Sequence, residues 1–223
     1  MRRAVLILLA AAGCLPAVAG AQTGGIGLPP PAAPPPPAAY PPIAWRASLA
    51  IGRPWDGKLV RGVQLPAQGA DFFTWDPVYD LAPNRGWRRW GHDRLLRKLL
   101  RVLAAYRLAH PGVARVGIED ISRRHGGVFD ERFGGLGHKS HQIGLDVDVL
   151  YPRLDRAEVR ATRVREIDKL LAQDLVDRFV AARAQYVFVG PHTGLTGKRR
   201  VVQTLAFHDD HMHVRFRQRR SGR

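Results

Sequence analysis

Five of the nine histidines in this 223-residue sequence lie in two short stretches. The first stretch runs from His138 to Asp148, and the second runs from His208 to His213. Histidine is the commonest metal ligand, and its ordinary pKa lies close enough to neutral pH for it to serve in proton transfer. Two such clusters, well separated in the sequence, indicate a single site built from two segments of the chain.

The two stretches also carry carboxylates, which are ordinary zinc ligands like imidazole. A catalytic zinc site has three protein ligands and a fourth position for water, whose pKa the ion lowers to about 7. Histidines that do not bind the metal can then act as general base and general acid. The spacing favours zinc and hydrolysis but does not say which three groups bind; the candidates are His138, His141, Asp146, Asp148, His208, His211 and His213.

Strands would hold these side chains in position. Residues 144–151 alternate between apolar and acidic side chains, so a strand there places Asp146 and Asp148 on one face. The same period of two places His211 and His213 on one face of a second strand. Both clusters can therefore face one metal ion or one substrate.

The remaining elements indicate a mixed fold. Apolar residues at helical spacing predict two helices, and four segments fit strands. Elements of both kinds joined by tight turns predict an α+β fold: a single domain in which a central antiparallel sheet carries the zinc site and helices and loops flank it. The predicted helices span 92–110 and 156–184, and the predicted strands span 115–121, 144–151, 185–189 and 211–216.

The helix at 92–110 has one apolar face and one basic face. A basic amphipathic helix can lie on a membrane surface, or it can pack its apolar face on a core. We expect the second arrangement, with the basic side chains in solvent and Pro111-Gly112 ending the helix.

All five tryptophans lie within residues 44–90, which are also rich in glycine and proline. This composition predicts loops and short strands rather than long helices. Because aromatic side chains bury a large area, we expect most of the tryptophan rings in the core and one or two in a substrate groove.

The N-terminus has the features of a secretory signal. Residues 1–21 contain Arg2 and Arg3, a short apolar segment and a small-residue cleavage site that ends at Ala21. The apolar segment is too short to span a membrane comfortably. We expect export to the periplasm or the extracellular space, with no transmembrane span in the mature chain; an uncleaved anchor and lipidation at Cys14 are the alternatives.

Residues 22–43 are rich in proline and predict an extended spacer, followed by one domain over 44–223. Cys14 is the only cysteine, so cleavage after Ala21 leaves a mature chain without a disulfide or a thiolate ligand. The core must therefore be stable without such crosslinks.

The formal net charge is +16, and removal of Arg2 and Arg3 leaves 33 basic and 19 acidic residues, a net charge of +14. A strongly cationic exported protein implies an anionic partner, such as an acidic cell-wall polymer, an anionic lipid or nucleic acid. The Arg-rich tail from Arg215 to Arg223 fits any of these. The export signal and the lack of a nucleic-acid motif favour the cell-wall polymer over nucleic acid.

Two strings in the sequence carry a resemblance to a known family. Ser140-His-Gln-Ile-Gly-Leu-Asp-Val-Asp148, together with His208-Asp-Asp-His-Met-His-Val-Arg215, resembles the penicillin-insensitive murein endopeptidases. These are zinc peptidases of a wider fold group that includes lysostaphin, the D-Ala-D-Ala metallopeptidases and hedgehog-like domains. The resemblance therefore implies a zinc peptidase of this α+β fold group.

The same residues meet the pattern of the wider group, which is a histidine, six residues, an aspartate and a distant His-x-His. The resemblance implies that His141, Asp148 and His213 bind the zinc and that Asp146 orients one of these ligands. Weaker similarity extends the resemblance over most of residues 50–216, and it lies at 62–66, 90–92 and 118–135.

The resemblance also implies a reaction. His211 would be the main catalytic base and acid, while His208 and His138 would assist the water and the transition state. The expected reaction is hydrolysis of the D-alanyl-diaminopimelate crosslink of peptidoglycan, with zinc and an imidazolium stabilising the oxyanion and no acyl-enzyme. Two alternatives remain: a D,D-carboxypeptidase or dipeptidase of the same fold group, and a non-catalytic cationic cell-wall-binding protein.

Overall fold

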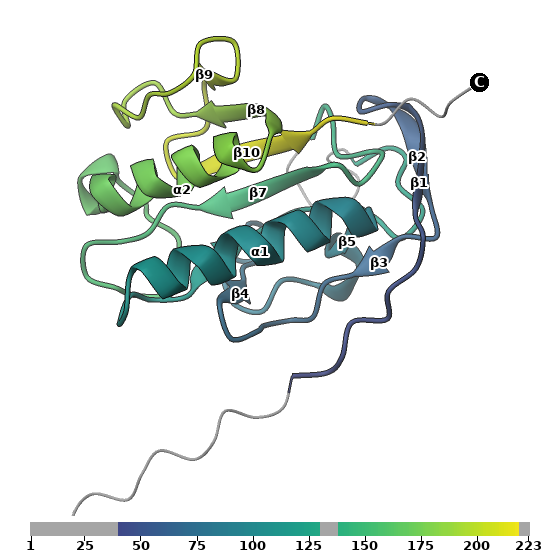
Figure 1. The fold of residues 1–223 in the computed structure, drawn as a ribbon, viewed down its shortest axis with the longest axis horizontal. Helices are drawn as coiled ribbons and strands as arrows, with labels where there is room; N and C mark the ends of the chain where they lie inside the picture. The colour runs from purple at the N-terminus through teal and green to yellow at the C-terminus, as the bar shows by residue number, and fades with distance from the viewer. Residues whose placement is uncertain (1–39, 130–137, 219–223) are drawn as a thin grey trace, which may run out of the picture. The chain divides into compact units, whose positions relative to one another are not determined.

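The computed structural model describes residues 40–129 and 138–218 (Figure 1). The predicted signal peptide, most of the proline-rich spacer and residues 219–223 of the Arg-rich tail lie outside the described residues. The described part contains two α-helices and three β-sheets.

A six-stranded mixed sheet forms the centre of the fold. Its strands, in spatial order, are β4 (Phe72–Thr74), β6 (Val116–Ile118), β7 (Asp146–Leu150), β10 (His211–Phe216), β8 (Ala184–Val189) and β9 (Val202–Thr204). The three central pairings are antiparallel, whereas the outer pairs β4–β6 and β8–β9 are parallel. The predicted α+β fold class is confirmed, with a sheet that is antiparallel at its centre and parallel at both edges. All four predicted strands occur, and β10 has the predicted bounds.

Two small antiparallel sheets lie beside the central one. A hairpin pairs β1 (Leu49–Arg53) with β2 (Asp56–Val60), and β3 (Val63–Gln64) pairs with β5 (Trp90–Gly91). Short strands and loops were the expectation for residues 44–90, and the structure has this character.

The first helix, α1 (Asp93–Ala109), agrees with its prediction. The His92 ring accepts a hydrogen bond from the Arg94 amide at its start, and Gly112, with φ of 81°, turns the chain after its end. Its apolar face is buried in the core rather than laid on a membrane. No helix of the described residues is both long enough and apolar enough to cross a bilayer.

The second helix, α2 (Lys169–Ala181), is much shorter than the predicted helix over 156–184. Asp168 caps the helix by accepting a hydrogen bond from the Leu171 amide at 3.1 Å, which satisfies one of its free N-terminal donors. Before this cap, Arg156 has φ of 59° and Ile167 is extended, so the chain there cannot be helical. The apolar spacing of residues 164–167 reflects packing against the core by a loop that contains one short 3-10 helix, Val164–Glu166.

Both helices cover the same face of the central sheet (Figure 1). The apolar side chains of β7 and β10 are buried, and all except Leu150 pack with the apolar faces of α1 and α2, whereas Leu150 packs with Phe73 and Trp75. Because strand side chains alternate between faces, the polar residues of these two strands point to the other side of the sheet. The sheet thus separates an apolar helix side from a polar side; the core residues on its helix side include Val147, Val149, Met212, Val214, Leu99 and Phe179.

The tryptophan rings are less buried than expected. Trp75 is buried, but Trp45 and Trp55 are 37% and 51% exposed, and the remaining two are half-buried, so the expectation that most rings lie in the core is wrong. Arginines cover these rings instead: the Arg97 guanidinium lies 4.0 Å from the Trp45 ring centre, and that of Arg53 lies 6.0 Å from Trp55. Cation–π contacts give an aromatic ring a partner at the surface of an arginine-rich protein.

The start of α2 can be tested by substituting Asp168. If Asp168 is the N-cap, Asp168→Ala lowers the free energy of unfolding by about 1 kcal/mol, and Asp168→Asn retains most of it. If the helix instead ran through this position, alanine would stabilise the protein, because alanine has the higher helix propensity. Urea denaturation of the two variants and the parent protein shows whether the free energy of unfolding falls or rises. A stabilised alanine variant would contradict the observed helix start.

Candidate metal centre and catalytic cleft

The pairing of two central strands brings the sequence clusters together. In the antiparallel register of β7 with β10, His213 lies opposite Asp148 and Arg215 lies opposite Asp146. Residues that face each other across such a pair project on the same side of the sheet. These four side chains therefore lie on the face away from α1 and α2.

The loop before β7 supplies His141, which is fully buried and has φ of 74°. Its Nδ1 lies 2.8 Å from the backbone carbonyl oxygen of Ile121. A carbonyl oxygen can only accept a hydrogen bond, so Nδ1 carries the proton and Nε2 presents its lone pair to the site. Gly144, with φ of 68°, completes this turn; a Cβ there would lie 2.9 Å from the His92 backbone nitrogen.

Three side chains converge at this point. His141 Nε2 lies 3.3 Å from His213 Nδ1 and 3.4 Å from Asp148 Oδ2, and His213 Nδ1 lies 3.0 Å from Asp148 Oδ1. A tetrahedral zinc ion with bonds of about 2.0–2.1 Å keeps its ligand atoms about 3.3–3.4 Å apart. The separations are close to this value, with the two histidines on different oxygens of the Asp148 carboxylate.

Asp146 orients the His213 ring from behind. Its Oδ1 lies 2.8 Å from His213 Nε2 and 2.5 Å from Arg215 Nε. Because a carboxylate accepts, Nε2 donates, and Nδ1 is the His213 atom that faces the other two ligands. Asp148 Oδ1 has no hydrogen-bond partner among the described residues despite its contact with His213 Nδ1. A cation between these atoms would stabilise such a buried group.

The charges of the centre also favour a cation. Burial alone would lower the pKa of His213, but its hydrogen bond to Asp146 and the negative charges of Asp146 and Asp148 raise it to about 9. Burial would raise the pKa of Asp148, but His141 and His213 hold it well below its ordinary value. Two buried carboxylates thus attract positive charge, which either a proton on His213 or a metal ion on the neutral ring can supply.

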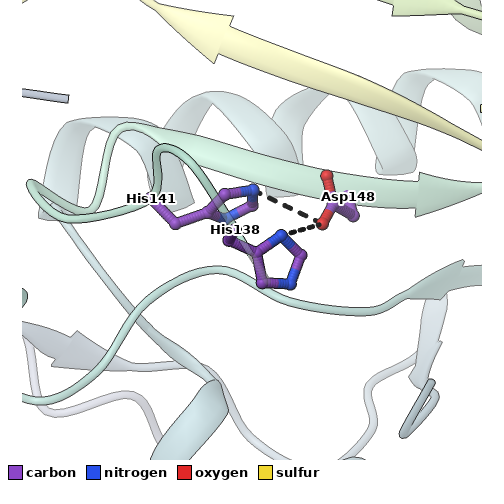
Figure 2. Close-up of side chains that lie close together, drawn as sticks. All are labelled: His138, His141 and Asp148. Carbon is purple, nitrogen blue, oxygen red and sulfur yellow. Dashed lines mark ion pairs between the residues drawn. The ribbon is translucent and has the colours of Figure 1, made fainter. Parts of the chain in front are cut away.

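A second set of three groups shares two of these ligands. Figure 2 shows His138, His141 and Asp148, whose ligand atoms all lie within 4.8 Å of one another. His138 Nδ1 is 3.7 Å from Asp148 Oδ2, and its Nε2 is 2.7 Å from Asp120 Oδ2. The contacts of the set with His213 are shorter, whereas those of the set with His138 meet at the single oxygen Oδ2 of Asp148.

His211 lies at the start of β10 among acidic groups. Its Nδ1 is 2.7 Å from Asp210 Oδ1 and 4.0 Å from Glu119 Oε2. Burial would lower its pKa, but the hydrogen bond with Asp210 and the charges of Asp148 and Glu119 raise it to about 9. With Nδ1 engaged by Asp210, Nε2 is the ring atom left to exchange a proton with a substrate.

His208 lies beside His211, with the ring centres 4.8 Å apart. Its Nδ1 is 2.7 Å from the Ala206 carbonyl oxygen, so this nitrogen donates and Nε2 can accept. Burial and the neighbouring His211 lower the pKa of His208. Two adjacent imidazoles with opposite pKa shifts are suited to act as an acid and a base in one reaction.

A cleft opens over these residues, with a volume of about 610 Å³. Its lining includes His138, His141, Asp148, His208, His211 and His213, so six of the seven candidate ligands border one space, and the seventh, Asp146, lies behind His213. The cleft walls are largely apolar, with Trp55, Phe188, Leu205 and Phe207, and carry the cations Lys139 and Arg215. Trp55 is therefore one of the tryptophans expected in a groove.

Three acids in the site are not among the candidate ligands that the sequence singles out: Glu119, Asp120 and Asp210, of which only Asp210 lies within a histidine cluster. Burial raises the pKa of Glu119 to about 8, and its Oε1 has no hydrogen-bond partner among the described residues. A sequence signal for two of them exists, because Glu119 and Asp120 directly follow the apolar strand β6. Consecutive acids at the end of a buried strand are a sign of a site.

Asp120 links the site to Arg88, the largest fully buried side chain of the described residues. Arg88 binds the Asp120 carboxylate with two nitrogens, and His138 contacts one of the same oxygens. Burial would raise the pKa of Asp120, but hydrogen bonds from His138 and Arg88 lower it. This pair fixes the carboxylate that holds His138.

Removal of Arg88 should therefore be costly. Arg88→Met leaves a buried carboxylate without its main partner and is expected to lower the free energy of unfolding by about 3–5 kcal/mol. Arg178→Met removes a half-exposed pair with Asp174 on α2 and is expected to cost less than about 1 kcal/mol. Thermal or urea unfolding measures both, and equal small losses would show that the buried pair does not stabilise the fold.

Sequence comparison places the chain in a family. The profile of the penicillin-insensitive murein endopeptidases matches residues 50–195. This range holds His138, His141 and Asp148, and it ends before β10, whose His211 and His213 join the site through strand pairing. No curated protein matches the chain in a sequence search. The match covers well over half of the sequence, and the chain therefore belongs to the penicillin-insensitive murein endopeptidase family.

Proposed function

We propose that the protein is a zinc-dependent endopeptidase that hydrolyses D-alanyl-diaminopimelate crosslinks in peptidoglycan. The observation that carries the proposal is the convergence of His141, His213 and Asp148 at separations of 3.0–3.4 Å. The family supplies the murein substrate, and the donor set of two imidazoles and one carboxylate is typical of catalytic zinc.

His141, Asp148 and His213 hold the metal in this proposal. The Ile121 carbonyl and Asp146 fix the ring tautomers, so that both imidazoles present a lone pair to the same point. When bound, zinc supplies a Lewis acid that polarises the scissile carbonyl and lowers the pKa of water to about 7.

His211 acts as the main base and acid. Asp210 holds its Nδ1, and its Nε2 takes the proton of the attacking water and passes it to the leaving amine. A cation bound at Asp148 offsets one of the charges that raise the His211 pKa, and this favours the neutral base before attack. Glu119 and Asp210 then stabilise the imidazolium once it forms.

His208 and His138 assist from two sides of the cleft. His208 lines the cleft and, with its lowered pKa, is a neutral ring whose Nε2 can accept a hydrogen bond. His138, held by Asp120, lies beside the Asp148 carboxylate and completes the polar floor. No side-chain nucleophile is required, because water attacks the amide directly.

The cleft suits a peptide that carries both methyl and carboxylate groups. Apolar walls at Trp55, Phe188 and Phe207 can pack on D-alanine and on the aliphatic diaminopimelate chain. Lys139 and Arg215 are the cations of the lining and can pair with free carboxylates of the stem peptides. A substrate of this class occurs in the cell envelope.

The proposed peptidoglycan substrate and the N-terminal sequence together support export of the protein. In this proposal residues 1–21 are a signal peptide, residues 22–43 are a spacer and residues 44–223 are the catalytic domain, located in the periplasm or outside the cell.

Digestion of purified peptidoglycan sacculi tests the proposed activity. We expect the protein to convert crosslinked dimers to monomers, to lose this activity with a chelator and to regain it with zinc. His211→Ala is expected to lower the rate by at least about 10²-fold while zinc still binds. Chromatography of the released muropeptides measures conversion; chelator-resistant cleavage, or cleavage of uncrosslinked peptides alone, would contradict the proposal.

Phe207 offers a test of substrate contact. Its side chain is 93% exposed on the rim of the cleft, and its φ of 64° is unusual for a residue with a side chain. Phe207→Ala is expected to raise KM for crosslinked muropeptides about tenfold, through loss of apolar contact, and to leave kcat nearly unchanged. Leu170→Ala, which removes an exposed apolar side chain from α2, is the control; equal KM changes in both variants would exclude a specific role for Phe207.

A further inference from the structure

A second cavity lies away from the catalytic cleft and is lined by basic side chains. It has a volume of about 870 Å³ and lies where the start of α1, the end of α2, the start of β8 and the end of β10 meet. These four ends converge on one side of the sheet in Figure 1. Its charged lining residues are Arg94, Lys98, Arg183, Lys198 and Arg217, and no aspartate or glutamate lines it. We call it the basic pocket.

Three of the five cations have no carboxylate partner. Arg183, Lys198 and Arg217 are exposed, and none of them forms an ion pair within the described ranges 40–129 and 138–218. Cations gathered around one concave surface repel one another unless an anion lies between them. The basic pocket therefore has an excess of positive charge, and a bound anion would be stabilised there.

The walls of the basic pocket are fixed by the fold. Lys98 donates a hydrogen bond to the Ala182 carbonyl at the end of α2, and its Nζ lies 4.8 Å from the centre of the Phe216 ring. Arg183 follows α2 with φ of 62°, a conformation that glycine adopts more readily. A cationic side chain thus occupies a position where the backbone favours glycine, and it lines the pocket.

The dipole of α2 opposes the binding of an anion at its C-terminal end, but its effect is small. The C-terminal end of α2 carries about half an elementary negative charge, and Lys98 hydrogen-bonds one of its terminal carbonyls. Five full positive charges outweigh this term. The balance of the pocket is strongly positive.

We propose that the basic pocket binds a phosphate group. A phosphate carries about −1.5 to −2 charges and three acceptor oxygens. It can therefore pair with several cations at once, which a single carboxylate cannot. Three arginines supply planar donor pairs that match phosphate oxygens. The pocket lies on the helix side of the sheet, whereas the catalytic cleft opens on the other side. A phosphate-bearing envelope component can therefore hold the protein while the cleft remains open to its substrate.

The test uses the complete chain and a charge-matched control. Inorganic phosphate is titrated calorimetrically at low ionic strength into the parent protein, into Lys198→Glu/Arg217→Glu, and into Arg101→Glu/Arg165→Glu. The control changes the net charge equally at exposed positions outside the pocket lining. We expect the pocket variant to bind phosphate at least about tenfold more weakly, and the control to bind within about twofold of the parent.

A second arm identifies the source of the phosphate. The same three proteins are sedimented with vesicles of phosphatidylglycerol and phosphatidylcholine, and with vesicles of phosphatidylcholine alone. Pocket-dependent binding to the anionic vesicles identifies a lipid head group, and pocket-dependent phosphate binding without vesicle binding identifies a soluble phosphate-bearing group. Equal losses in the pocket variant and the control, or no phosphate binding by the parent, would overturn the proposal. Unchanged thermal unfolding verifies that all variants fold, and neither readout depends on peptidase activity.

Discussion

The antiparallel pairing of β7 with β10 is the interaction on which the site depends. It places Asp148 opposite His213 and Asp146 opposite Arg215, so that residues from distant parts of the chain become neighbours. A slip of one residue would turn every side chain of a strand to the other face. The buried Val147 and Val214 on the helix side prevent this slip, since it would place charged groups in the apolar core. Core packing thus sets the geometry of the proposed metal ligands.

Burial of so many charged groups on the opposite face requires partners for each. Arg88 binds Asp120 and Arg215 binds Asp146, and His138 and His213 share oxygens of these two carboxylates. A buried charge without a partner would cost several kcal/mol, so these pairs are a condition for the fold to hold the site. Hydrogen bonds also fix the ring orientations, because His141 and His213 each donate one ring N–H to a fixed acceptor and keep the other ring nitrogen for the proposed metal. The same contacts therefore serve stability and chemistry.

The parts of this structure that follow a short local period could be predicted from the sequence. The alternation in residues 144–151 and 211–216 gave both strands and the face of each candidate ligand, and α1 followed from its apolar stripe. The second helix was predicted too long because residues 164–167 repeat the helical spacing while packing as a loop, and Asp168 alone marks the true start. The spacing of apolar residues alone does not distinguish a helix from a loop that packs on the core.

The rest of the site depends on contacts between distant residues. The contact of Glu119 with His211 arises only when the end of β6 and the start of β10 lie side by side, and no spacing within either segment reveals this. The tryptophans were expected in the core because their size favours burial, but Trp45 and Trp90 are covered by arginines that are distant in the sequence, Arg97 and Arg124. Such contacts are set by the assembled fold.

The central claim is that β7, β10 and the loop before β7 form one metal site from His141, Asp148 and His213. X-ray absorption at the zinc edge, on protein loaded with one equivalent of zinc, measures the ligands directly. We expect two imidazole nitrogens among four nitrogen or oxygen neighbours at about 2.0–2.1 Å, with one imidazole lost in His213→Ala and both retained in His138→Ala. Loss of an imidazole in His138→Ala but not in His213→Ala would contradict the claim, as would protein that retains no zinc.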